Sequence, residues 1–413
     1  MTLLMKWFAS AVLLLSALFG AMTASAATRT AASCSTGDVQ TAVSGASPGD
    51  TVKVPAGTCS WSGNIAISGI TLMGAGKDAS TGTTITSGGV TMTKHASQIT
   101  RLSGFRFTAG GNHGSVVGSA SARAFVIDNN YFYSSGGGDV YFMNINVNGG
   151  VLHHNDFYMN PSSGGGPDVF AIHPGEGWSQ ATTMGTADTQ GPAGGERNIY
   201  FEDNTFTNCL ETCPDGDDGA RLVIRHNKYY DSSIVFHSGK PNDTSTDGHR
   251  HFEIYENEFH RAIANNNINK WIWVRGGSGV IANNYMDAAS SSEFGGKNQI
   301  ILSVGCPGSP AWPVDHQIGQ TVLPATSPAQ PLLIFGNSGP GSSGSSFLIL
   351  NGSEGGGVSC GSPTTYVQSG RDYMTSNTWG WKPFTYPHPL VTGGGGNTGT
   401  GPTPPTGVQA VAN

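Results

Sequence analysis

The sequence of 413 residues has few charged side chains and none of the long periodic runs of a helical protein. Only 11% of its residues are Asp, Glu, Lys or Arg, and the 27 acidic ones outnumber the 20 basic ones. An acidic chain is a poor candidate for nucleic-acid binding, so we expect no nucleic-acid partner. No long stretch after residue 45 shows apolar residues at a period of 3.6, which argues against a helical protein. No apolar run is long enough for a comfortable membrane span.

Several motifs that identify enzymes and metal proteins are also absent. The chain has no G-x-S-x-G elbow and no H-E-x-x-H pair. Its six cysteines include no C-x-x-C pair, which favours disulfides over zinc as their role. Sequence alone leaves the connectivity open. By proximity we favour the pairs Cys34 with Cys59, Cys209 with Cys213, and Cys306 with Cys360.

The N-terminal segment indicates export. Lys6 precedes a short apolar run, and Ala24, Ser25 and Ala26 form a small-residue cleavage site, so residues 1–26 are typical of a bacterial secretory signal peptide. We expect residues 27–390 to form one domain. Residues 391–413 are rich in Gly, Thr and Pro, which is typical of a flexible tail or linker stub. We therefore predict a secreted or cell-surface protein that acts as a monomer.

A short phrase recurs along most of the chain: alternating apolar residues lead into an Asn, and an aromatic residue follows two places later. The copies lie at intervals mostly in the twenties, enough for three short strands, which is the size of one turn of a parallel β-helix. Stacked asparagines at a corner can bond to the next turn and form a ladder, while the aromatic residues stack in the core. The aligned asparagines are Asn130, Asn155, Asn204, Asn227, Asn257, Asn284 and Asn337.

The two ends of the domain complete the expected fold. The segment DVQTAVSGASPGD predicts a short helix with Asp38 as its N-cap, which caps the first turn of the coil. VPAGTCSWSG, the NN-x-F repeats, RGGSGVIANN and GWKPFTYPHPL resemble secreted members of the pectate-lyase-like superfamily. The resemblance implies an all-β fold, a single-stranded right-handed parallel β-helix (solenoid) with an N-terminal cap helix. It indicates no single reaction, because the superfamily includes lyases, hydrolases and noncatalytic adhesins.

The resemblance also implies a location for the site. In such folds the exposed face of the first strand of each turn, with its flanking loops, forms a polysaccharide groove. The candidate first strands are residues 169–174, 209–212, 233–239 and 270–277. Strand alternation turns Ile172, Ile234 and Ile272 inward. The outward residues are then His173, Glu211, His237, Trp271, Trp273 and Arg275.

These residues and the loops after them suit β-elimination on a uronic-acid polysaccharide. That reaction requires a neutralised substrate carboxylate, a base, and an acid for the leaving oxygen. The candidate catalytic residues are His173, His237, Lys240, Arg250 and Arg275. The candidate substrate-binding residues are Glu176, Trp178, Trp271 and Trp273. Glu211, Asp215, Asp217 and Asp218 are candidate Ca²⁺ ligands, although an acidic surface turn explains them equally well.

We therefore predict a lyase that cleaves an acidic, uronate-containing extracellular polysaccharide, with Ca²⁺ as a candidate cofactor. Two alternatives stay open: a noncatalytic glycan-binding surface or adhesin module, and a glycoside hydrolase with a carboxylate pair. The W-x-D-H and R-x-P-x-x-R motifs of typical pectate lyases are absent, as is the polygalacturonase motif set. The sequence thus favours a reaction class without naming the sugar.

Overall fold

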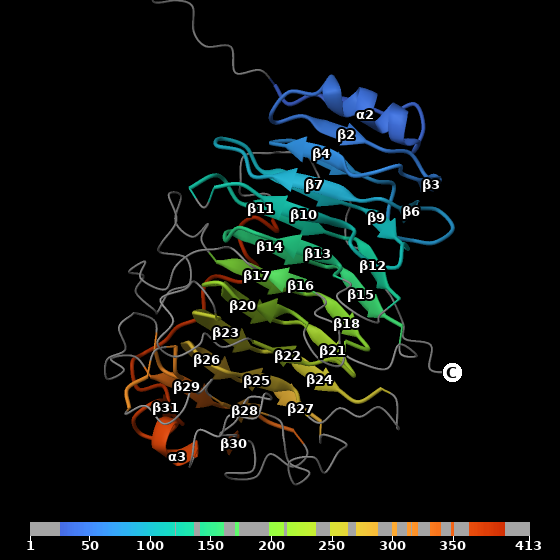
Figure 1. Cartoon of the computed structure of the whole chain (residues 1–413). Helices are drawn as coiled ribbons and strands as arrows, with labels where there is room; N and C mark the ends of the chain where they lie inside the picture. The colour runs from blue at the N-terminus through green and yellow to red at the C-terminus, as the bar shows by residue number, and fades with distance from the viewer. Residues whose placement is uncertain are drawn as a thin grey trace, which may run out of the picture.

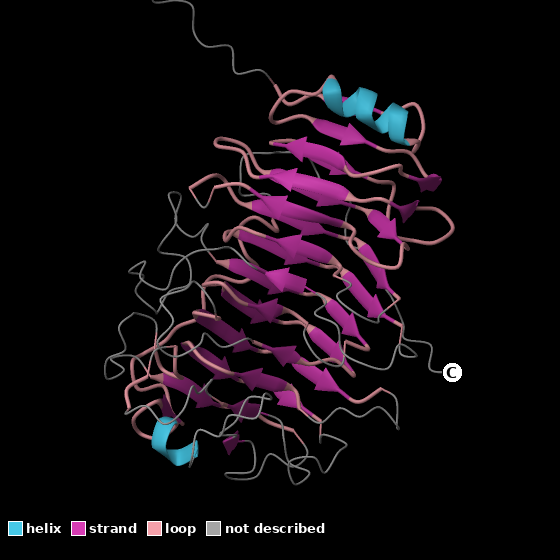
Figure 2. Ribbon diagram, in the orientation of Figure 1, coloured by secondary structure: helices cyan, strands magenta, loops and turns pink. Residues whose placement is uncertain are grey.

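The computed structural model is a parallel β-helix, in which the chain forms three strands per turn and successive turns stack along one axis (Figure 1). Strands make up nearly all of its regular structure (Figure 2). This confirms the predicted all-β solenoid. The structure describes residues 25–119, 121–135, 141–160, 170–172, 198–209, 213–236, 248–262, 270–287, 300–303, 312–314, 316–320, 331–339, 348–350 and 363–392.

The strands form four parallel sheets, here called A to D. Sheet A contains β1 (Thr28–Thr30), β2 (Thr51–Lys53), β5 (Thr71–Met73), β8 (Thr100–Ser103), β11 (Phe125–Asp128), β14 (Gly150–His153), β17 (Ile199–Glu202), β20 (Arg221–Arg225), β23 (His251–Tyr255), β26 (Ser278–Ala282), β29 (Leu332–Phe335) and β31 (Tyr373–Met374). Sheet B contains β3 (Gly57–Ser60), β6 (Thr83–Ser87), β9 (Phe105–Phe107), β12 (Tyr131–Ser134), β15 (Asp156–Met159), β18 (Thr205–Thr207), β21 (Lys228–Tyr230), β24 (Glu258–His260) and β27 (Tyr285–Met286).

The first strand of each turn belongs to sheet C and then to sheet D. Sheet C contains β4 (Ile65–Ser68), β7 (Val90–Thr93), β10 (Gly114–Val117), β13 (Met143–Ile145), β16 (Phe170–Ile172) and β19 (Asp215–Gly216). Sheet D contains β22 (Ile234–Val235), β25 (Ile272–Val274), β28 (Ile300–Leu302) and β30 (Leu348–Leu350). A short helix, α3 (Pro363–Tyr366), precedes the last strand. No helix in the described ranges is long and apolar enough to cross a membrane.

The predicted asparagine ladder is present at the corner between sheets A and B. Along the ladder, the side-chain oxygen of one asparagine accepts two hydrogen bonds from the asparagine one turn earlier, one from its backbone N–H and one from its side-chain amide. Asn227 accepts both from Asn204, each at 3.0 Å. The same contacts link all seven predicted asparagines in order. The residue before each ladder asparagine has a φ between 54° and 66°. That left-handed conformation turns the corner within two residues.

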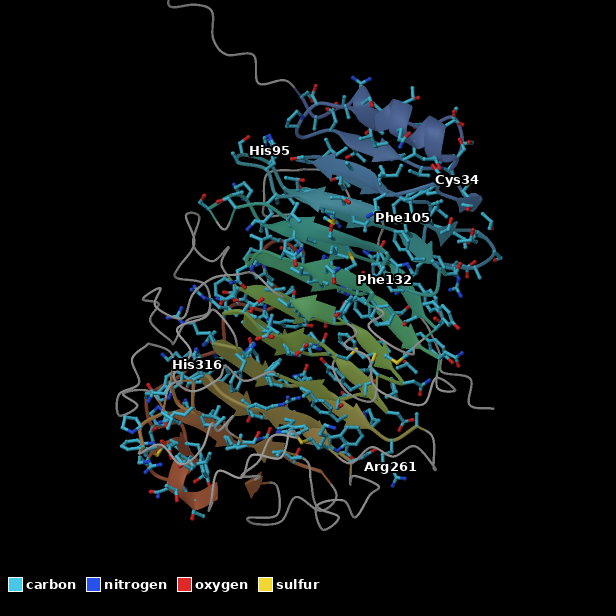
Figure 3. All side chains as sticks on the ribbon, viewed as in Figure 1. Cys34, His95, Phe105, Phe132, Arg261 and His316 are labelled. Carbon is cyan, nitrogen blue, oxygen red and sulfur yellow. A yellow bond between two sulfur atoms is a disulfide. The ribbon has the colours of Figure 1, made fainter. Side chains whose placement is uncertain are left out.

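The aromatic residues two places after the ladder asparagines stack inside the coil, as predicted. Phe132 lies 5.3 Å from Phe157, and the series continues through Phe206 and Tyr229 to Phe259 at ring-centroid distances of 4.9, 4.7 and 4.6 Å. Phe105 and Phe132 lie in this interior (Figure 3). Each ring buries apolar area against the next turn, so the core continues from turn to turn.

The N-terminal helix, α2 (Thr36–Ser44), lies at the end of the coil next to β4 (Figure 1). Its N-cap is Ser35, whose hydroxyl accepts from the backbone N–H of Asp38, so the predicted start at Asp38 was wrong. Asp38 instead lies in the first turn, where a carboxylate stabilises the helix dipole. The role of α2 as a cap for the coil stays a prediction.

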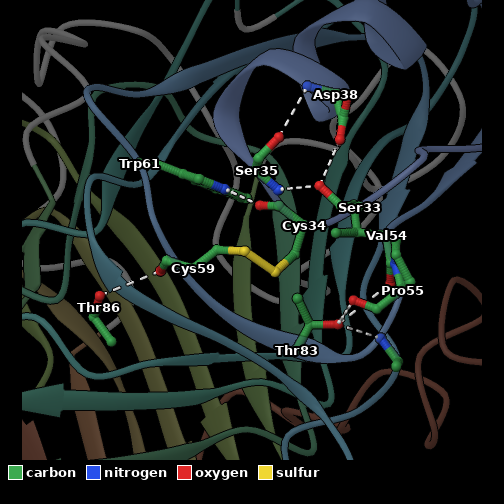
Figure 4. The surroundings of a disulfide bond; sticks show 11 residues. Ser33, Cys34, Ser35, Asp38, Val54, Pro55, Cys59, Trp61, Thr83 and Thr86 are labelled. Atoms are coloured by element: carbon green, nitrogen blue, oxygen red, sulfur yellow. Dashed lines mark hydrogen bonds between the residues drawn. A yellow bond between two sulfur atoms is a disulfide. The ribbon is translucent and has the colours of Figure 1, made fainter.

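The disulfide between Cys34 and Cys59 was predicted correctly and joins the segment two residues before α2 to β3 (Figure 4). The Trp61 indole donates to the Cys34 carbonyl at 2.9 Å beside it. The predicted bond between Cys209 and Cys213 was wrong, because both are buried free thiols in the structure. Burial raises the pKa of the Cys213 thiol, and each thiol is packed into the core of its turn. Cys306 and Cys360 lie outside the described residues.

Residues 379–391, here called the strap, pack on the outer face of sheet A. Trp381 and Leu390 join a second apolar cluster with outward residues of sheet A such as Val126 and Val280. Strands β20 and β23 are therefore buried along their whole length. Strands of a parallel sheet that is covered on both faces have continuous apolar sequences, and the run LVI before Arg225 fits this pattern.

The strap also closes over a buried ion pair. Glu202 and Arg225 lie opposite each other in register on β17 and β20, and both side chains are fully buried. Glu202 accepts from Arg225 Nε at 2.8 Å and Nη2 at 2.6 Å, and its other oxygen accepts from the His388 backbone N–H. The remaining Arg225 donors bond to the Tyr255 hydroxyl and to the carbonyls of Phe384 and Thr385.

Candidate functional site

The connections between strands differ sharply in length around the coil. From β8 onward every corner from sheet A to sheet B takes two residues or fewer, whereas long connections border sheets C and D on both edges. On the edge toward sheet A these are residues 173–198, 236–250 and 303–331, and on the edge from sheet B they include residues 261–271 and 287–299. Binding residues concentrate on loops held by a rigid scaffold, so the outer face of sheets C and D is the candidate site.

Strand β25 presents the clearest group of functional side chains on this face. Ile272 and Val274 point into the core, as predicted, so Trp273 and Arg275 point outward. The Arg275 guanidinium lies 4.4 Å from the Trp273 ring centroid, and the Lys270 ammonium lies 5.3 Å from it. The Trp273 indole donates to Ser303 Oγ at 2.9 Å, which fixes the ring on the sheet. We call Lys270, Trp273, Arg275 and Ser303 the sheet D group.

The sheet D group combines a sugar-stacking ring with two cations. A half-exposed indole offers an apolar surface to the C–H face of a sugar. The partly exposed Arg275 supplies positive charge beside it within a chain of net charge −7, and Lys270, only 3% exposed, adds charge from beneath the surface. This local concentration of positive charge is what an acidic protein requires to hold an anionic substrate.

Two predictions about neighbouring residues were wrong. Trp271 precedes β25 and is fully buried against Phe259, and its indole donates to the Asp287 carbonyl at 2.7 Å, so it offers no surface to a sugar. It lies at a bend, where strand alternation does not yet apply. The strand predicted at residues 209–212 is also displaced, because β16 pairs with β19, at Asp215–Gly216.

Arg250 and His249 lie directly before β23 and are almost fully buried. His249 stacks on Phe236 with ring centroids 4.0 Å apart, and burial lowers the pKa of its imidazole well below the usual value. It is therefore a neutral core residue. Arg250 is 1% exposed, unlike the open loop residue that we expected, and its catalytic role stays a prediction.

The predicted calcium ligands do not form a metal site in the described part of the chain, where no cluster of three or more acidic, His or Cys side chains could hold an ion. One oxygen of Asp217 already accepts the backbone N–H groups of Asp218 and Gly248, at 2.9 and 2.5 Å. Asp215 lies on β19 and is buried. These bonds are those of an acidic turn. The fourth predicted ligand, Glu211, lies outside the described residues.

Several other predicted site residues also lie outside the described residues, so their roles stay predictions. The set is His173, Glu176, Trp178, His237 and Lys240. The strands that lead to two of them were predicted correctly, since β16 ends at Ile172 and β22 ends at Val235.

The sequence interpretation missed Lys270 and Ser303. Lys270 is the first residue of the predicted strand but lies two residues before β25, and its proximity to Trp273 follows from the bend at Trp271 rather than from strand alternation. Ser303 follows β28, the neighbour of β25 in sheet D, and lies one full turn further along the chain. The signal for it was the strand run QIILS before a long connection, but the register between β25 and β28 was needed to pair it with Trp273.

A cavity of about 590 Å³ lies elsewhere, at the N-terminal end of sheet A. Its lining includes Lys53, Met73, Lys77 and Asn129. Lys77 is bound to Asp156 at 2.7 Å and to the His154 carbonyl at 3.0 Å, so its ammonium serves the fold. The cavity lacks the aromatic and cationic combination of the sheet D group.

Comparisons with known proteins add one structural similarity. No protein-family model and no curated protein matches the sequence. The chain is similar to the crystal structure of an alginate lyase from Paenibacillus sp. strain FPU-7, with a TM-score of 0.35 and 13% sequence identity. The match covers 76% of this chain and 87% of that one.

Proposed function

We propose that the protein is an exported polysaccharide lyase that cleaves an acidic, uronate-containing glycan by β-elimination on the outer face of sheet D. The observation that carries the proposal is the partly exposed Arg275 guanidinium, which lies 4.4 Å from the centroid of the partly exposed Trp273 ring. The buried Lys270 ammonium lies 5.3 Å from the same centroid. An indole beside an accessible guanidinium suits a sugar ring that bears a carboxylate.

In the proposed reaction a base removes the proton from the carbon next to the substrate carboxylate. The electron pair forms a double bond to the neighbouring carbon, the glycosidic C–O bond there breaks, and the leaving oxygen takes up a proton. Charge builds up on the carboxylate as the proton leaves, so Arg275 stabilises that state directly, and the buried Lys270 adds to the local positive charge. His237, predicted one strand before Arg275, is the proposed base.

The acidic residues in the described part of the chain do not gather into a calcium site, so the reaction is written here with the cationic side chains alone. Calcium assistance through Glu211 stays a prediction. A parallel assay with and without chelator addresses it directly: loss of turnover in chelator supports a cation requirement, and unchanged turnover assigns charge neutralisation to the cationic side chains.

The test is a panel of pectate, alginate and glycosaminoglycans, monitored for the ultraviolet absorbance of an unsaturated uronate. We expect Arg275→Ala to lower kcat/KM by about 100-fold or more on the substrate cleaved, as loss of a transition-state charge partner does. Arg275→Lys should recover part of the loss. Arg29→Ala removes a half-exposed arginine at the far end of the coil and is the matched control.

Each other outcome points to a different function. Reducing ends without new absorbance would identify a hydrolase, and binding without any product would identify a glycan-binding module. An Arg275→Ala variant with wild-type turnover would remove sheet D from the mechanism.

A further inference from the structure

The outer face of sheet B carries a row of half-exposed aromatic side chains. On each strand the middle residue, such as Phe132 or Phe157, points into the core, so the residues on either side point outward. Five of these outward residues are tyrosines and one is a histidine, and none is buried. We call this set the tyrosine face: Tyr131, Tyr133, Tyr158, Tyr230, His260 and Tyr285.

Register places most of these side chains in one column along the coil axis. Tyr133 pairs with Tyr158, Tyr158 with Thr207, Thr207 with Tyr230, and Tyr230 with His260. The rings of Tyr133 and Tyr158 are nearly parallel with centroids 6.1 Å apart, and those of Tyr230 and His260 are 5.6 Å apart. Neighbouring strands repeat about every 4.8 Å, so the column is a regular track.

The charges on this face are matched with one another. Lys77 binds Asp156 at 2.7 Å, and His260 lies 3.2 Å from Glu258 and 3.6 Å from Asp287. Arg106 lies over the Tyr131 ring, and Lys228 faces Glu258 in register. Three basic residues (Lys77, Arg106, Lys228) and three acidic ones (Asp156, Glu258, Asp287) give a net charge of zero with His260 neutral. The face therefore has no net attraction for a polyanion.

The aromatic side chains of this face are partly exposed, and Thr207 separates Tyr158 from Tyr230 in the column. A group of accessible aromatic side chains on one face marks a candidate binding surface. The outer face of sheet A shows the contrast, because the strap covers its aromatic residues Tyr200 and Tyr255. On sheet B the equivalent outward positions stay partly exposed, and Tyr285 is 37% exposed.

We propose that the tyrosine face binds an extended, uncharged β-linked polysaccharide strand that lies along the coil axis. Rings that stack on one another, as Tyr133 and Tyr158 do, leave their edges and hydroxyls for contact, and these suit the hydroxyl groups of such a chain. One sugar unit of an extended chain is about as long as one turn of the coil is high, so successive sugars meet successive turns. This binding function is noncatalytic and does not rest on the proposed lyase activity.

The test is depletion of the full-length protein from solution by microcrystalline cellulose, at low salt and in 1 M NaCl. We expect the wild type to bind equally at both salt concentrations, because the face has no net charge. The triple variant Tyr133→Ala, Tyr158→Ala, Tyr230→Ala should lose binding by at least about 10-fold. The triple Tyr→Phe variant should keep most of it, and it also serves if the alanine variant folds poorly.

Trp273→Ala on sheet D is the matched control and should bind cellulose as the wild type does. Failure of the wild type to bind, equal binding by the alanine variant, or binding that 1 M NaCl abolishes would each overturn the proposal. A lyase assay on the same triple variant separates the two sites, because soluble acidic substrate should be cleaved at the wild-type rate.

Discussion

Removing the Glu202 carboxylate tests how the strap is held. In the folded protein all five Arg225 N–H groups are bonded, and both Glu202 oxygens accept hydrogen bonds. Glu202→Ala leaves the guanidinium buried without a counter-charge. Loss of one partner from a buried pair costs about 3–5 kcal/mol in the free energy of unfolding.

The exposed ion pair between Lys77 and Asp156 provides the matched control. Its side chains are 28% and 41% exposed, so water screens the charges. Asp156→Asn should therefore cost about 1 kcal/mol or less. Urea unfolding monitored by tryptophan fluorescence measures both variants, and Trp381 in the strap contributes to the signal.

A second assay assigns the loss to the strap. Chymotrypsin cuts after aromatic residues, and Trp381 and Phe384 lie in the strap beside Glu202 and Arg225. We expect Glu202→Ala to be cut there much faster than the wild type, because the strap opens locally before the coil unfolds. The double variant Glu202→Ala, Arg225→Met should recover stability, since it leaves no buried charge. Equal costs for Glu202→Ala and Asp156→Asn would refute the reasoning.

Three further predictions concern stability. Asn204→Ala should lower the free energy of unfolding in urea by about 3 kcal/mol, because it leaves the buried Asn155 N–H without an acceptor. Asn337→Ala, at the partly exposed end of the ladder, should lower it by less. Burial lowers the pKa of His113 and His153 to about 4, so the unfolded chain takes up their protons first and stability should fall as the pH drops from about 6.5 to 4. Replacing both by Gln should flatten that pH dependence, and an unchanged slope would exclude these histidines as its cause. Cys34→Ser should lower the unfolding midpoint of the N-terminal turns, with a loss of about 3 kcal/mol in the free energy of unfolding. A reducing agent should not lower the midpoint of this variant any further.

The ladder could be predicted from the sequence because one chemical requirement repeats at every turn. A buried amide needs a partner, and the partner is the same residue one turn later, so Asn130 through Asn337 reveal both the corner and the stacking direction. The inward rings follow from the same alignment by strand alternation. Local chemistry and global fold agree at these positions.

The candidate site depends on features that do not repeat. Trp271 was misplaced because a bend rotates it into the core before alternation begins. β19 is only two residues long, too short to give a periodic signal. The sequence pattern therefore predicted the strand at residues 209–212 instead. The strap segment GWKPFTYPHPL resembles the ends of such folds, but its contact with Glu202 joins residues 186 positions apart. Such pairings have no local signature.

The two proposals give the outer faces of the coil different roles. The strap occupies sheet A, and the proposed polysaccharide sites lie on sheets B and D. The two proposed sites share turns, since β24 on sheet B leads directly through residues 261–271 to β25 on sheet D. A protein held on an uncharged fibre by the tyrosine face would keep its sheet D group at a high effective concentration beside acidic chains in the same matrix. The triple Tyr→Ala variant should then cleave soluble acidic substrate normally but act more slowly on the same substrate embedded in cellulose. Equal slowing on both substrates would show that the tyrosines act on the fold or the reaction rather than on attachment.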